Sequence, residues 1–191
     1  MLYSFISTKA PNFGGLWESQ IKVLKTHLFR VIGSQLLTYE EMNTVLVQIE
    51  AVLNSRPLCP ISSDANDLQA LTPGHFLTLE PLNSPPDSDL SHVKLSHLSR
   101  WQLLQQMHQS FWNRWHNEYL HTLMQRKKWT KPSSCIDLGT MVLVKNGGVK
   151  SFLTPPLNWN LGRITRVVSI KTASSELRRP VTQVCPLPDN I

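Results

Sequence analysis

Long apolar runs are missing from this sequence. No stretch approaches the ~20 consecutive apolar residues that a membrane-spanning helix needs, so a membrane partner is not expected. The start, MLYSFISTKAP, has only a short apolar stretch before Lys9 and Pro11 and no small-residue cleavage site, so it does not predict a secretory signal. Charged residues are also few, at 17%, whereas hydrophobic residues make up 41%. These values predict a folded rather than a disordered protein, and the missing signal predicts a nuclear or cytoplasmic protein that is not secreted.

Cysteine pairs are missing as well. The three cysteines, Cys59, Cys135 and Cys185, are odd in number and widely spaced, and none belongs to a C-x-x-C motif. This usage predicts reduced, buried thiols in a cytosolic or nuclear protein rather than a disulfide framework or a zinc site. The seven histidines are not accompanied by a cysteine pair either, and a zinc site needs four convergent ligands. We therefore expect no metal or other cofactor from these residues.

The net charge of +6 is distributed unevenly along the chain. Residues 1–58 carry five Lys or Arg against four Glu, and residues 59–95 carry one Lys against five Asp or Glu. Residues 96–131 carry six Lys or Arg against one Glu, and residues 132–191 carry seven against three Asp or Glu. A basic C-terminal half favours a polyanionic partner, most simply DNA or another nucleic acid. A solvated surface that aids solubility is the alternative, and charge alone leaves both open.

Two amphipathic helices are predicted in the N-terminal part. The first spans about residues 16–32 and ends at Gly33, and its apolar side chains fall within one arc of roughly 100°. The second begins after Thr38, whose hydroxyl can accept from the Glu41 amide while the Glu41 carboxylate reaches back, and it ends near Asn54. The expected core face of the first helix consists of Trp17, Ile21, Leu24, Leu28, Val31 and Ile32.

The rest of the chain changes character twice. Residues 59–94 are acidic and rich in Pro, Ser, Asp and Asn, which predicts a loop-rich linker. Residues 95–131 predict one long connecting helix, whose aromatic stripe we interpret as a packing seam rather than a base-stacking platform. Residues 132–191 alternate with period two in GTMVLVK, WNLGRITRVVSIK and RPVTQVC, which predicts a small β-barrel-like domain. The predicted fold class is therefore α+β. The stripe consists of Trp101, Leu104, His108, Phe111, Trp112, Trp115, Tyr119 and Leu123.

Several long segments resemble a known family. FISTKAPNFGGLWESQIKVLK is similar to the stretch around the last catalytic carboxylate of BEL/Pao-type LTR retrotransposon integrases. The similarity continues through LTYEEMNTVLVQIEAVLNSRPLCPISSDANDLQALTPGHFL and SRWQLLQQMHQSFWNRWHNEYLHTLMQRKKW to GTMVLVK and LGRI, which resemble the C-terminal domain of these polyproteins. It covers nearly the whole chain in order, and runs such as APNFGGLWE and LNSRPLCP are specific.

The resemblance implies a definite chemistry for the full family. Such integrases have a ribonuclease-H-like core in which two Asp and one Glu hold two Mg²⁺ ions for phosphoryl transfer. Glu18 matches the third carboxylate, and Lys22 and Lys25 match two lysines that related retroviral enzymes present to a DNA end. These three residues are also spaced to share one helix stripe. The alternative for Glu18 and Lys22 is an ordinary surface ion pair.

The sequence departs from the family pattern in two respects. No Asp precedes Asp64, so the two catalytic Asp have no counterpart, and Glu18 would contribute to a metal site only if both were supplied by another polypeptide. We therefore expect a truncated, non-catalytic protein. The loss of the core sheet also predicts self-association or poor packing of the first two helices. Second, the run LGRITRVVSIKT lacks the turn that separates two strands in relatives, which predicts fused strands and an incomplete SH3-like barrel.

The predicted organisation has four parts: a remnant of the ribonuclease-H-like core (1–58), the acidic linker (59–94), the connecting helix (95–131) and the β domain (132–191). The favoured function is residual, sequence-independent nucleic-acid binding. The alternative is a protein-interaction module that uses exposed helix faces. The residues expected to contact phosphates are Lys22, Lys25, Arg126, Lys127, Lys128, Lys131, Arg163, Arg166, Lys171, Arg178 and Arg179.

Overall fold

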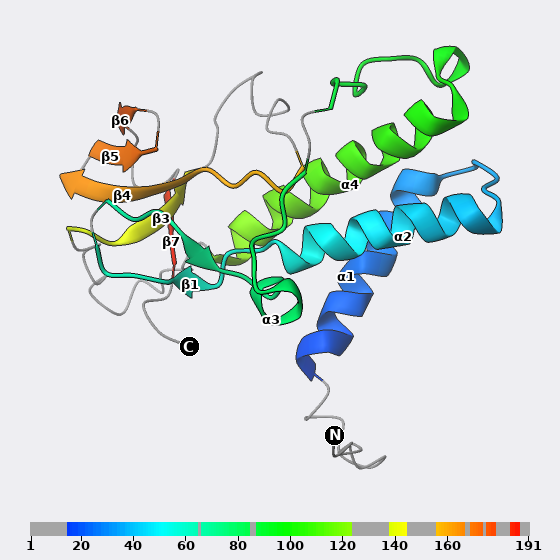
Figure 1. Cartoon of the computed structure of the whole chain (residues 1–191). Coiled ribbons are helices and arrows are strands. Elements are labelled where there is room, and N and C mark those ends of the chain that lie inside the picture. Colours follow the sequence, from blue (N-terminus) through cyan, green and yellow to red (C-terminus); the bar gives the residue numbers. More distant parts are fainter. Residues whose placement is uncertain are drawn as a thin grey trace, which may run out of the picture.

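A helical part and a five-stranded antiparallel sheet make up the computed structural model, which confirms the α+β prediction. Helices α1 (Gly15–Ile32) and α2 (Tyr39–Asn54) both pack on α4 (Arg100–Leu123), and the sheet lies at the C-terminal end of α4 (Figure 1). The structure describes residues 15–64, 66–84, 87–123, 138–144, 156–166, 169–173, 175–178 and 184–187.

The first two helices form where the sequence predicts them. Gly33 ends α1 with φ +56°, a left-handed conformation that glycine adopts without steric cost. At the start of α2 the capping box is present: the Glu41 amide donates to Thr38 Oγ1 at 3.3 Å, and the Thr38 amide donates to Glu41 Oε2 at 2.8 Å. Both predictions are confirmed. They could be made from the sequence because the end of α1 and the start of α2 depend on interactions between residues that are close in the sequence.

The core face of α1 differs in part from the prediction. Leu24, Leu28 and Val31 pack against the main core as expected, and Val23 joins them. Ile21, which we expected in this face, is 48% exposed. The most buried residue of the described part of α1 is instead His27. A helical wheel gives the width of an apolar arc but not its rotation relative to a neighbour, and α4 sets that rotation here.

Helix α4 is the central element of the fold. It follows a 3₁₀ turn at Leu95–His97 and is described as far as Leu123, so the predicted extension to residue 131 lies outside the described residues. Most of its predicted aromatic stripe is buried, with Trp112 only 1% exposed, which confirms a packing seam. Trp101, near the N-terminal end, is the exception at 57% exposed. The main core is formed by Val45, Ile49, Val52, Leu103, Leu104, Met107, Phe111, Trp112 and Trp115.

The sheet has the strand order β6-β5-β4-β3-β7, and every neighbouring pair is antiparallel. Its outermost strands, β6 and β7, both contribute to one buried cluster with Val142, Val144, Ile164 and Ile170, so the sheet is strongly curved around these residues. The opposite face packs on the end of α4 through Leu120 and Met141. The strands are β3 (Met141–Val144), β4 (Leu161–Arg166), β5 (Ser169–Thr172), β6 (Glu176–Arg178) and β7 (Val184–Pro186).

The prediction that LGRITRVVSIKT forms one fused strand is wrong. Strands β4 and β5 are separate and pair antiparallel, with Ile164 opposite Ile170 and Arg166 opposite Ser169. Gly162 on β4 has no side chain, which allows β5 to pack closely against it. A Cβ at this position would lie 2.5 Å from Ile170 Cγ2 and 2.9 Å from the Lys171 carbonyl oxygen. The shortened sequence therefore still forms a hairpin.

The acidic segment is attached to both parts of the molecule. Within it, β1 (Cys59–Pro60) pairs with β2 (Ala70–Leu71), and α3 (His75–Thr78) follows. Further along, the Leu90 amide donates to the buried side chain of Gln109 on α4 at 3.0 Å. Gln109 in turn donates to the Ser88 carbonyl oxygen at 2.8 Å. The segment lacks long elements, as predicted, but these contacts fix it to the fold. In the part of the chain that the structure describes, no helix is long and apolar enough to span a membrane.

Candidate nucleic-acid interface

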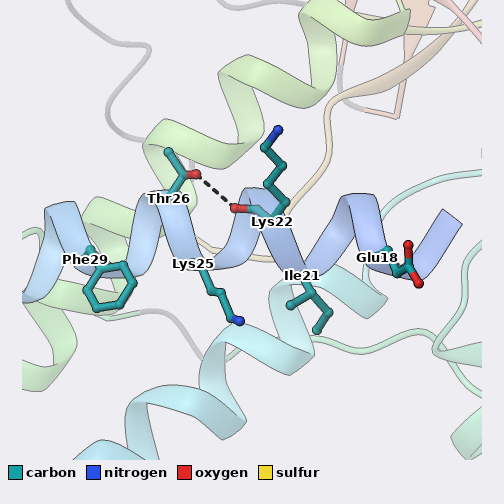
Figure 2. A pocket seen from close by; sticks show the side chains of 6 residues that line it. All are labelled: Glu18, Ile21, Lys22, Lys25, Thr26 and Phe29. Atoms are coloured by element: carbon teal, nitrogen blue, oxygen red, sulfur yellow. Dashed lines mark hydrogen bonds between the residues drawn. The ribbon is translucent and has the colours of Figure 1, made fainter. Parts of the chain in front are cut away.

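The outer face of α1 carries the three residues that match the integrase motif. Glu18, Lys22 and Lys25 all lie at the surface, and Figure 2 shows Lys22 and Lys25 leaving α1 in opposite directions. They border a shallow hollow of about 450 Å³ that is also lined by Ile21, Thr26 and Phe29. The three residues therefore border one hollow, although their side chains leave the helix in different directions, and two exposed apolar side chains, Ile21 and Phe29, accompany them.

The charges on this face are not engaged with one another. The ion pairs that the structure describes join His27 to Glu118 and Arg100 to Glu41, and neither includes Glu18 or Lys22. Glu18 and Lys22 point in different directions from the helix (Figure 2), so the alternative of a surface pair between them finds no support. This face consequently presents two ammonium groups and one carboxylate to solvent.

A metal site of the integrase kind does not fit this face. Among the described residues, no group of three or more His, Cys, Asp or Glu side chains lies close enough to hold a metal ion. A two-metal site needs several oxygen ligands for each Mg²⁺ ion, and Glu18 can supply only two oxygen atoms. We therefore derive no metal-dependent step from these residues.

A buried contact on the opposite side fixes the rotation of α1. His27 Nε2 lies 2.7 Å from Glu118 Oε2 of α4, and the His27 ring meets the Phe111 ring edge-on with centroids 5.9 Å apart. These two contacts connect α1 to the middle and the C-terminal half of α4. Sequence reasoning missed it because neither residue belongs to the apolar pattern, and only their contact reveals the role. With His27 turned inward, Lys22 and Lys25 are directed outward.

The sheet carries a second group of predicted phosphate contacts. Lys171 on β5 and Arg178 on β6 are exposed. In the register of the two strands Lys171 lies opposite Glu176 and Arg178 opposite Ser169, so both cations project from the same face of the sheet. Lys171 Nζ also donates to Asn66 Oδ1 at 2.9 Å. These two cations can approach one phosphate backbone together.

Arg163 requires a correction. Arg163 is only 5% exposed, and its guanidinium donates to the backbone carbonyl oxygens of Asp67 at 3.1 Å and Gly139 at 2.9 Å. A third hydrogen bond goes to the Ser62 carbonyl oxygen. A buried guanidinium with three carbonyl partners is a structural group rather than a free phosphate contact. Arg163 holds the acidic segment against the sheet, and we remove it from the predicted interface.

Other predicted contacts cannot be placed. Arg166 belongs to β4, but its side chain is not described. The remaining residues lie outside the described part of the chain: Arg126, Lys127, Lys128, Lys131 and Arg179. Their contribution stays a prediction.

The helical part and the sheet meet at an aromatic cluster around Trp159. Its ring contacts Trp112 with centroids 5.0 Å apart and Tyr119 with centroids 5.5 Å apart, and its Nε1 donates to Ser55 Oγ at 3.2 Å. The Tyr119 hydroxyl donates to the Pro57 carbonyl oxygen at 2.6 Å. Burial raises the pKa of Tyr119 to about 12, so the hydroxyl remains a donor at neutral pH. These contacts connect α2, α4 and the strand region in one packed unit.

The structure thus defines an α+β protein whose long helix and curved sheet pack together. Residues 99–187, which run from α4 to the end of β7, match a family of unknown function (DUF5641). No curated protein and no solved structure matches the chain at a significant level.

Proposed function

We propose that this chain is a non-catalytic, nucleic-acid-binding protein related to the BEL/Pao-type retrotransposon integrases, and that it acts in the nucleus or the cytoplasm. The motif match at Glu18, Lys22 and Lys25 supports the relationship. In this proposal α1 and α2 correspond to the last helices of a ribonuclease-H-like core. The curved sheet corresponds to an SH3-like barrel.

The charge of the C-terminal half is the observation that carries the binding proposal. Residues 96–191 hold thirteen Lys or Arg against four Asp or Glu. Arg114, Lys171 and Arg178 are exposed members of this set. Cations at this density favour a phosphate backbone by direct attraction and by release of condensed counterions. Contacts of this kind carry no base readout, so binding is independent of sequence.

The expected inactivity has its own test. Glu18 is the residue of this sequence that matches one of the three catalytic carboxylates of the family, and one carboxylate does not assemble a two-metal site. Incubation with a labelled DNA end and Mg²⁺ or Mn²⁺ should give neither end processing nor joining. Product that disappears in Glu18→Gln would overturn the non-catalytic assignment.

The binding proposal is tested with matched charge reversals in the full chain. Separate halves are unsuitable because α1, α2 and α4 share one core. The variant Lys127→Glu/Lys128→Glu should weaken binding to all duplex sequences alike, by about tenfold or more at low salt. The control Lys22→Glu/Lys25→Glu changes the net charge equally but should weaken binding less. An equal or larger effect of the control would place the interface on α1 instead.

A protein-interaction module is the second candidate, and α3 favours it. Phe76, Leu77 and Leu79 on and beside this short helix are all exposed. Leu79 also has φ 63°, a left-handed conformation that costs a non-glycine residue energy. An apolar patch with local strain is typical of a surface that binds a partner. Association through this patch would persist at high salt, whereas phosphate binding would weaken.

A further inference from the structure

The outer face of α1 combines exposed apolar and charged side chains in an unusual way. Phe29 is 73% exposed and Ile21 is 48% exposed, although both lie on a regular helix that packs well on its other side. Glu18 and Lys25 flank Ile21 along the same face, and neither takes part in the described ion pairs. Exposed apolar side chains bordered by charges without a described ion-pair partner form a surface that a second protein surface can cover.

The order of charges on this face is self-complementary. Glu18 and Lys25 are seven residues apart, so they lie about 10.5 Å apart along the helix axis, too far for an ion pair within one helix. Two helices that lie antiparallel across a two-fold axis place each residue opposite its mirror position about a common midpoint. The midpoint between positions 18 and 25 coincides with the midpoint between Ile21 and Lys22. One antiparallel register therefore satisfies both charges in both copies.

We propose that a second copy of this chain binds the outer face of α1, with the two α1 helices antiparallel. Glu18 of each copy pairs with the partner's Lys25, and Ile21 packs against the aliphatic stem of the partner's Lys22. Phe29 lies toward the start of the partner helix, which begins at Gly15. A parallel arrangement would instead place Glu18 beside Glu18 and Lys25 beside Lys25, so charge selects the antiparallel one.

The geometry of the described residues leaves room for this contact. Glu18, Ile21, Lys25 and Phe29 are exposed, and α1 packs on α4 through its other side. The shallow hollow between Ile21, Lys25 and Phe29 can receive a side chain of the partner. Two large apolar side chains per copy make a small interface, so the dimer is weak and reversible. This inference does not rest on the proposed function, because it concerns the pairing of two copies of the chain and not a contact with phosphates.

Charge reversal and charge exchange test the proposal. The molecular mass of the full chain would be measured by sedimentation or light scattering from micromolar to millimolar concentration. By symmetry each single reversal, Glu18→Lys or Lys25→Glu, replaces two attractive pairs by two repulsive ones, so the dissociation constant should rise about tenfold. The double exchange Glu18→Lys/Lys25→Glu should restore dimerisation. Lys94→Glu, an exposed lysine elsewhere, is the control and should have no effect.

A third variant tests the apolar contact without changing charge. Phe29→Ala removes an exposed ring, so it should leave the fold intact, as circular dichroism and thermal unfolding would verify, and still weaken the dimer. A chain that remains monomeric at millimolar concentration would overturn the proposal. So would a dimer that tolerates both single reversals, because its interface would lie elsewhere. Loss of dimerisation in the double exchange would contradict the antiparallel register.

Discussion

Helices α1 and α4 are both long and amphipathic, yet they are used in opposite ways. Nine residues of α4 are buried, and the helix contacts α1, α2 and the sheet. Of the α1 side chains that the structure describes, only His27 is buried, and one whole face is open to solvent. This difference could not be predicted from the sequences of the two helices, because each has an apolar arc of ordinary width.

The comparison shows that α4 provides the stability of the fold and that α1 provides a surface. The aromatic side chains of α4 fill the core and the junction with Trp159. By contrast, α1 is held through one side by His27 and a few aliphatic residues. Substitutions on α4 should therefore change the free energy of unfolding, and substitutions on the outer face of α1 should change association.

The sharpest test of this contrast compares two tryptophans of the same helix. Trp112→Ala removes a ring that is 1% exposed, and it should lower the free energy of unfolding by about 3–5 kcal/mol. Trp101→Ala removes a ring that is 57% exposed and should change that free energy by less than about 1 kcal/mol. Urea denaturation followed by circular dichroism measures both. Similar losses in the two variants would mean that α4 is not the centre of the core.

A second substitution tests whether the sheet depends on the close approach of β4 and β5. Gly162→Ala adds a Cβ that would meet Ile170 Cγ2 at 2.5 Å and backbone at 2.9 Å. Because the backbone cannot move without opening the hairpin, we expect a loss of about 1–3 kcal/mol. Ala173→Ser also adds a single heavy atom, but at an exposed position just beyond β5, so this control should be close to neutral. A neutral Gly162→Ala variant would show that the two strands are further apart than described.

The contact between His27 and Glu118 can be broken from one side. In Glu118→Ala the buried His27 ring loses its partner at Nε2, which should cost about 1–3 kcal/mol of stability. Glu50→Ala removes an exposed carboxylate from α2 and serves as the control. Hydrogen exchange would localise the effect, with faster exchange in α1 than in α4. Uniform acceleration in both helices would contradict the view that this pair specifically holds α1.

The smallest effect concerns acid stability at the start of α2. Hydrogen bonds from the Arg100 guanidinium and then from the Thr38 backbone amide lower the pKa of Glu41 from 4.5 to about 2. A carboxyl whose pKa is lowered by folding stabilises the fold above its unfolded pKa, and this contribution is lost as the pH falls from about 4.5 to about 2. Glu41→Gln should therefore show a shallower loss of stability across this window than the parent chain. If the free energy of unfolding changed with pH in the same way in both proteins, the contact between Glu41 and Arg100 would have no role in acid stability.

Local signals account for most of what could be predicted from the sequence. The capping box at Thr38, the helix end at Gly33 and the aromatic seam of α4 depend on neighbouring residues or on periodicity, and all are confirmed. The buried Arg163 and the outward Ile21 could not be predicted, because each depends on which distant segment covers it.

The strand prediction failed for a different reason. The run LGRITRVVSIKT reads as one continuous strand because no turn residue interrupts it. Arg166 nevertheless pairs with Ser169. The two residues between them in the sequence, Val167 and Val168, are not typical turn residues and give no signal for a hairpin. For the candidate site, the position of Glu18, Lys22 and Lys25 around one hollow followed from helix spacing, whereas the exposure of Phe29 beside them did not.

We propose that the basic C-terminal half binds nucleic acid through the phosphates of the backbone. The most direct test is the affinity of the full chain for random-sequence duplex DNA, measured across a series of salt concentrations by titrating trace labelled DNA with the protein to saturation. We expect the logarithm of the binding constant to fall linearly with the logarithm of the salt concentration, with a slope of about −0.9 for each phosphate contacted and a smaller slope in Lys127→Glu/Lys128→Glu. No binding at low salt, or binding that does not change with salt, would contradict it.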